Sequence, residues 1–318
     1  MRDRRSDFDV TNTVQVSSPS EVCAAVKGIW SHHFDAPAYA PVAAAFHKLE
    51  AAFVGRAPGL HGIETTYHDL QHTLDVTLAM ARLLDGHARE HGASELGQER
   101  WAVGLITALF HDAGYLRKLR DTQHQHGAEY TRVHVSRSAD MLVELLPELG
   151  YGDASDIAAE MVHFTGYERP FDQIDIEDPK WIKTGHLLGT ADMLAQMADR
   201  CYLEKCRDRL YAEFEMGGMA RMRAPDGRII VNYSSPKDLL KKTPGFCTTT
   251  LEKRLGGQFD KAHRYLDVHF GGPNLYLQEI RANLAHLSRV IEEGRWDLLR
   301  RKPPCFNIDH FSRNETRH

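Results

Sequence analysis

Histidines and an aspartate with helical spacing are the residues of this chain most suited to chemistry. His68 and His72 lie four apart in "YHDLQH", a spacing that places two side chains on one face of a helix. His111 and Asp112 directly follow the apolar segment "WAVGLITALF", at the expected end of a helix. An ionised carboxylate is costly to bury without a partner, and metal coordination is a standard remedy. This pattern therefore favours a metal site.

Further residues of the same types recur along the chain. His134 lies in "RVHVSRSADML", His163 in "EMVHFTGY" and Asp192 in "GTADMLAQMAD". Helical proteins build dinuclear metal sites from His and carboxylate side chains that project inward from several helices. We therefore expect two divalent metal ions, and the ligand types leave Mg, Mn, Fe, Co and Zn open.

The segment around Asp192 has a distinctive helical face, formed at steps of four, three, four and three by Gly185, Gly189, Asp192, Gln196 and Asp199. Glycine inside a helix costs roughly 1 kcal/mol relative to alanine. Two glycines beside a carboxylate favour a cleft that something must approach closely, and the alternative is a solvated stripe with tolerated glycines. Gln196 is accordingly a candidate substrate contact.

Two further candidate substrate contacts come from other segments. His124 in "RDTQHQHGAEY" could contact a phosphate, and the alternative is a surface loop, because connections usually run over the surface. Tyr115 could form the floor of a substrate pocket, although aromatic side chains on helices more often belong to the core.

The stretch "YHDLQHTLDV", residues 67–76, resembles the YHNxxHAxDV signature of the cyclic-nucleotide phosphodiesterases. With the later His-Asp pair and Asp192 in the same order, residues 60–200 resemble the HD/PDEase superfamily of metal-dependent phosphohydrolases. The resemblance implies a first metal held by His72, His111, Asp112 and Asp192. It also implies that Asp112 bridges to a second metal and that His68 is a general acid.

Two details qualify the resemblance. His134 and His163 fall where HD branches with extra histidines, such as the HD-GYP proteins, supply ligands for the second ion. Phosphodiesterases continue HDxDHPG after the His-Asp pair, whereas this chain reads "HDAGY" at residues 111–115 and has neither the second Asp nor the second His. The surroundings of the second metal are therefore expected to differ from those in the phosphodiesterases.

The expected chemistry is hydrolysis of a small phosphomonoester, phosphodiester or nucleotide, including a cyclic nucleotide. Two metal ions can lower the pKa of bound water to about 7 and contact both the attacking and the leaving oxygen. A nearby histidine can then protonate the leaving oxygen. Two alternatives stay open: a di-iron HD-type oxygenase, and a nucleotide-binding regulatory module without turnover.

Composition narrows the class of protein. The 318 residues are 42% hydrophobic and 26% charged, as in ordinary globular proteins, and the net charge of −5 argues against extended nucleic acid as a partner. The five scattered cysteines contain no CxxC pair, and no apolar run approaches the roughly 20 residues that a membrane span needs. We expect a cytoplasmic protein without a membrane partner, of open oligomeric state.

Helical periodicity dominates the chain and predicts an all-α bundle with an HD/PDEase-like core. One domain is expected over residues 21–300, preceded by a flexible leader at 1–20 and followed by an irregular tail at 301–318. The segment "ARMRAPDGRIIVNYSSP", residues 220–236, has β-branched residues after Pro225-Asp226-Gly227 and predicts a short hairpin between helices. The predicted helices span 21–31, 38–54, 67–85, 97–117, 127–147, 154–164, 179–215, 248–270 and 274–293.

Overall fold

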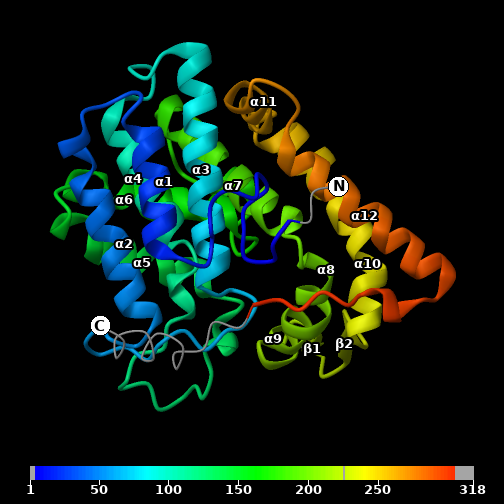
Figure 1. The fold of residues 1–318 in the computed structure, drawn as a ribbon. Helices are drawn as coiled ribbons and strands as arrows, with labels where there is room; N and C mark the ends of the chain where they lie inside the picture. The colour runs from blue at the N-terminus through cyan, green and yellow to red at the C-terminus, as the bar shows by residue number, and fades with distance from the viewer. Residues whose placement is uncertain (1–3, 225, 305–318) are drawn as a thin grey trace, which may run out of the picture.

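Helices carry almost all of the regular structure (Figure 1). The computed structural model describes residues 4–224 and 226–304. The longer helices are α1 (Pro19–Trp30), α2 (Ala40–Phe53), α3 (Leu70–His91), α4 (Gly97–Phe110), α5 (His134–Glu148), α7 (Pro179–Ala198), α10 (Pro236–Thr249) and α12 (Leu275–Glu293). The shorter ones are α6 (Ser155–Met161), α8 (Tyr202–Lys205), α9 (Tyr211–Met216) and α11 (Tyr265–Phe270), with π-helical turns at Cys206–Leu210 and Thr250–Gln258.

The predicted all-α class and its small hairpin are both confirmed. Strands β1 (Arg221–Arg223) and β2 (Ile229–Val231) pair antiparallel, with Met222 opposite Ile230. Residue 225 of the predicted turn lies outside the described residues, and Gly227 has a φ of +85°, which glycine adopts without strain. No helix in the described part of the chain is both long and apolar enough to cross a membrane.

Helix α3 is the central element of the fold. Its N-cap is Asp69, whose side chain accepts a hydrogen bond from the backbone N–H of His72, so the helix begins at Leu70. Nearly every residue from Leu70 to Ala88 is buried, as expected for a helix enclosed on all sides. Helices α1, α4, α7 and α11 pack around it (Figure 1).

Helix α7 packs along α3 and α4 and is the second buried helix. It begins as predicted, with Asp178 accepting a hydrogen bond from the Lys180 N–H and with Pro179 in the first turn. The two glycines of the predicted cleft face are needed for packing instead. A Cβ on Gly185 would lie 2.3 Å from the Phe164 ring, and one on Gly189 would lie 2.5 Å from the Phe259 ring. Aromatic side chains, rather than a ligand, approach α7 at these two positions.

The structure differs from the flexible leader expected over residues 1–20. Residues 4–18 pack against the helical body, and α1 already begins at Pro19. Asp9 and Arg82 of α3 form a buried ion pair, with exposed fractions of 1% and 4%. A buried guanidinium needs an anionic partner, and the leader supplies it.

Helix boundaries also differ in several places. Helix α5 begins seven residues later than predicted, after the irregular segment that carries His124. The predicted helix 179–215 is interrupted after Ala198, and α10 begins in a stretch where no helix was predicted, although it contains Pro236 and Pro244. The first of these prolines occupies the first turn of α10, where it is tolerated. Of the predicted tail, residues 301–304 form no regular element and 305–318 lie outside the described residues.

The close contact between α3 and α11 at Gly86 yields a prediction. A Cβ on Gly86 would lie 1.8 Å from the backbone oxygen of Tyr265, so Gly86→Ala must push the two helices apart. We expect it to lower the free energy of unfolding by about 1 to 3 kcal/mol in urea denaturation.

Gly28 provides the control, because it lies at an exposed position of α1 where a Cβ would meet nothing within 4 Å. Gly28→Ala should raise the free energy of unfolding by about 0.5 to 1 kcal/mol. Equal stabilities of the two variants would contradict this packing.

Candidate metal centre and adjoining cavity

Two imidazoles from different helices meet in the interior. His72 lies in the first turn of α3 and His111 is the C-cap of α4, with exposed fractions of 7% and 1%. The Nδ1 atom of His111 donates to the Ala108 carbonyl at 2.7 Å, which leaves its Nε2 as an acceptor. That Nε2 lies 3.4 Å from the Nε2 of His72. Two nitrogens therefore point at one small space.

Asp112 completes this group. The helix ends at His111, and the backbone of Asp112 (φ −105°, ψ 5°) turns its carboxylate back toward the same space. Its Oδ2 atom lies 3.2 Å from His111 Nε2 and 3.4 Å from His72 Nε2, yet it is buried and accepts no hydrogen bond from any described residue. This buried carboxylate oxygen is therefore available to a cation as a ligand.

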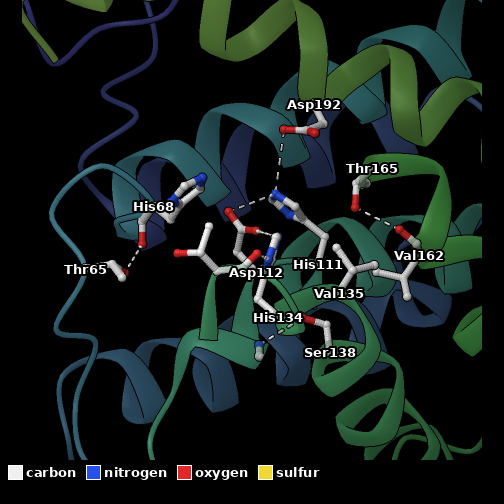
Figure 2. Close-up of polar contacts among 12 residues, drawn as sticks. Thr65, His68, His111, Asp112, His134, Val135, Ser138, Val162, Thr165 and Asp192 are labelled. Carbon is white, nitrogen blue, oxygen red and sulfur yellow. Dashed lines mark hydrogen bonds and ion pairs between the residues drawn. The ribbon is translucent and has the colours of Figure 1, made fainter. Parts of the chain in front are cut away.

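His72, His111 and Asp112 can hold a metal ion. One ligand atom from each residue lies within 4.8 Å of the others, and imidazole with carboxylate suits several divalent metals. Asp192 of α7 approaches from the opposite side, with its Oδ1 3.4 Å from His72 Nε2 and 3.8 Å from His111 Nε2. Figure 2 shows the side chains of His111, Asp112 and Asp192 directed toward one another. All four residues that the resemblance assigns to the first metal are thus brought together.

The electrostatics of the group favour a cation. Burial alone disfavours a charged imidazole, but Asp112 and Asp192 outweigh it and raise the pKa of His72 to about 10. The pKa of His111 is raised against burial by the same two carboxylates. Burial also opposes a charged Asp112, yet His111, His68 and His72 hold its pKa well below the usual range. The group binds positive charge strongly, whether as protons or as a metal ion.

His134 reaches the second oxygen of Asp112. It is the first residue of α5, and Gly114 allows the approach, because a Cβ there would lie 1.8 Å from the His134 carbonyl oxygen. The Nδ1 atom of His134 donates to the Thr131 carbonyl, and its Nε2 lies 3.6 Å from Asp112 Oδ1. Asp112 therefore presents Oδ2 to one pair of imidazoles and Oδ1 to another imidazole (Figure 2).

His68 lies beside the group but outside α3. It occupies the turn before the N-cap, so the predicted helical spacing of His68 and His72 is wrong, although their rings lie 6.0 Å apart. The ring of Tyr115 stacks against the rings of both His68 and His134, at 4.6 and 4.4 Å, and these two imidazoles lie 6.0 Å from each other. The aromatic stack holds both imidazoles at the cavity wall, where Tyr115 was expected.

Glu213 of α9 holds the His68 ring, and the sequence analysis missed it. Its Oε2 accepts a hydrogen bond from His68 Nδ1 at 2.6 Å, and its Oε1 accepts the backbone N–H groups of Thr66 and Tyr67. The carboxylate fixes the proton on Nδ1 and leaves Nε2 for the cavity. Burial lowers the pKa of His68, but Glu213 and Asp112 outweigh it and raise that pKa. The contact joins residues 145 apart, and nothing in the sequence around Glu213 marks it as buried.

Two predicted site residues lie elsewhere. His163 is buried in a short 3-10 turn after α6, and His124 forms an ion pair with Asp121 at 3.0 Å in the loop before Gly127. Among the described residues, neither lines the cavity at the metal group. His124 lies in a loop, which was the alternative considered for it.

A cavity of about 360 Å³ adjoins the group. Its wall includes His68, His72, His111, Asp112, Tyr115, His134, Asp192 and Gln196. Gln196 accepts a hydrogen bond from the Tyr67 hydroxyl at 3.3 Å. A volume of this order fits a small organic ligand.

The position of the Asp112 carboxylate predicts what its removal should do to metal binding. Asp112→Ala should abolish metal retention, measured by elemental analysis after dialysis against Mn, Fe, Co or Zn. Metal at 100 times its dissociation constant should stabilise the unchanged protein by about 2.7 kcal/mol and leave the variant unaffected. Asp140→Ala, on the exposed side of α5, is the matched control and should retain the metal. Wild-type metal content in Asp112→Ala would contradict the assignment.

Comparisons with known proteins add no relative. No protein-family model matches the chain, and no curated protein or solved structure matches it. The case for a metal site therefore depends on the geometry of His72, His111, Asp112 and Asp192 alone.

Proposed function

We propose that this protein is a metal-dependent phosphohydrolase acting on a phosphate ester. The observation that carries the proposal is the position of Asp112, whose two oxygens face two sets of imidazoles while His68 lies at the wall of the same cavity. Metal ligands, a proton donor and a substrate-sized space thus occur together, as metal-assisted hydrolysis requires.

The donors fit two divalent cations. His72, His111, Asp112 and Asp192 would hold the first, and His134 with the Oδ1 atom of Asp112 would hold the second. When bound, such cations activate water and offset the charge that develops on the phosphoryl oxygens. Water molecules can supply the remaining ligands of the second cation, because the described structure offers fewer protein donors there.

His68 supplies the proton. Its Nδ1–H is held by Glu213, so its Nε2 faces the cavity and can protonate the ester oxygen as the P–O bond breaks. The proton leaves with the alcohol and is regained from water. Glu213 also stabilises the charged imidazole before transfer. Glu213 thus acts as a positioning residue, since it touches His68 and not the reacting atoms.

Metal dependence is the first test of this function. Metal-stripped protein should not hydrolyse p-nitrophenyl phosphate or bis-p-nitrophenyl phosphate, and reloading with the best divalent metal should restore hydrolysis. Equal hydrolysis by stripped and loaded protein would overturn the proposal. Oxygen consumption by an iron-loaded protein that releases no phosphate would assign it to the di-iron oxygenases, and tight ligand binding without any turnover would identify a regulatory module.

The leaving group tests the role of His68. His68→Asn should retain the metal and lower kcat by about 10²- to 10⁴-fold for alkyl phosphates, whose alcohols need a proton, and far less for p-nitrophenyl phosphate. Glu213→Gln should show the same dependence on the leaving group, with a smaller loss.

His124→Asn is the matched control, because His124 lies in the Asp121 loop, and its kcat should stay unchanged. A uniform loss for all leaving groups in His68→Asn would remove His68 from proton transfer.

A further inference from the structure

The part of the cavity away from the metal group is formed by different elements. Its lining comes from the first π-helical turn, Cys206–Leu210, from α9, from the residues on either side of the hairpin, and from α10. Figure 1 shows where these elements lie in the fold. We call this part the apolar chamber, defined by Leu210, Phe214, Met219, Tyr233, Leu239 and Phe246. The rings of Phe214 and Tyr233 stack at 5.7 Å and build one wall.

Three polar side chains beside the apolar chamber, those of Thr243, Lys242 and Arg132, already have partners within the protein. The Thr243 hydroxyl donates to the Leu239 carbonyl at 3.0 Å. Lys242 donates to the Asn232 carbonyl at 2.6 Å and pairs with a carboxylate of its own helix at 3.2 Å. The guanidinium of Arg132 donates to the Gly218 carbonyl. Within the described part of the chain, Lys242 and Arg132 are the lysine and arginine residues that line the cavity.

The side chains of the apolar chamber determine which kind of ligand it can bind. A nucleobase carries several hydrogen-bond donors and acceptors. A pocket that binds a nucleobase specifically needs polar groups that are free to form hydrogen bonds with it. A polyphosphate needs cationic side chains directed at it. The wall of the apolar chamber offers aliphatic and aromatic side chains instead, so burial of apolar surface is the interaction that it can provide.

We propose that the substrate is a phosphate ester of a large, uncharged, apolar alcohol. This inference rests on the proposed phosphohydrolase function, with the phosphoryl group at Asp112 and the alcohol portion in the apolar chamber. Gln196 also lines the cavity, with its amide nitrogen 3.8 Å from the Met193 sulfur and its oxygen accepting a hydrogen bond from Tyr67. The chamber selects by size and apolar surface rather than by hydrogen bonds.

A series of alkyl phosphates tests the proposal, because ethyl, butyl and hexyl phosphate have nearly the same leaving-group pKa. With metal-loaded protein, kcat/KM should rise roughly fourfold for each added methylene until the apolar chamber is filled. Adenosine monophosphate should be a poorer substrate than hexyl phosphate. A kcat/KM that is flat across the alkyl series, or highest for the nucleotide, would overturn the inference.

Phe246→Ser removes part of the wall at a position that is already 38% exposed, so the fold should tolerate it. The ratio of kcat/KM for hexyl phosphate to that for ethyl phosphate should fall most of the way to one in this variant. Leu119→Ser, at an exposed residue outside this cavity, is the matched control and should keep the full gain.

Binding separates this inference from the proposed function. Isothermal titration of metal-loaded protein should show tighter binding of hexylphosphonate than of ethylphosphonate, which cannot be hydrolysed. If no ester is turned over but hexylphosphonate still binds tighter, the hydrolase function fails and the apolar chamber stands. If esters are turned over but the two phosphonates bind equally, the hydrolase stands and the apolar chamber fails.

Discussion

The case for a metal site depends on the buried carboxylate of Asp112 and on the imidazoles that surround it. Asp112 is 3% exposed, and its Oδ2 faces two imidazole nitrogens without accepting a hydrogen bond from any described residue. Burying such a charge costs several kcal/mol unless a cation compensates it. His72, His111 and Asp192 converge on the same point, so a cation there satisfies four groups at once. The convergence is the reason to regard this interior as a metal centre.

The candidate metal ligands and the other cavity-lining residues come from different elements of the fold. Helices α3, α4 and α7 are buried together and supply the ligands, so the metal group is held by the best-packed part of the molecule. The turn before α3, the short helix α9 and helix α10 supply His68, Glu213 and the apolar chamber. Changes in these outer elements could alter the substrate without disturbing the ligands, since binding residues commonly lie on segments positioned by a rigid scaffold.

Short-range patterns in the sequence predicted those features of the structure that depend on short-range interactions. Helical periodicity predicted the all-α class, and the order of His72, His111, Asp112 and Asp192 predicted their meeting in the interior. Contacts between residues far apart in the chain could not be predicted from the sequence. Glu213 meets His68 across 145 residues, and Gly185 is required by the packing of the Phe164 ring rather than by a ligand. His163 was expected beside the second metal from the resemblance, and it lies in a 3-10 turn and does not line the cavity.

Anomalous diffraction from crystals of the manganese-loaded protein tests the central claim most directly. The account predicts an anomalous peak at about 2.0 to 2.3 Å from His72 Nε2, His111 Nε2 and an oxygen of Asp112, the range for nitrogen and oxygen ligands of such metals. A map with no peak among these atoms, at full metal loading in solution, would show that the buried group holds protons rather than a metal.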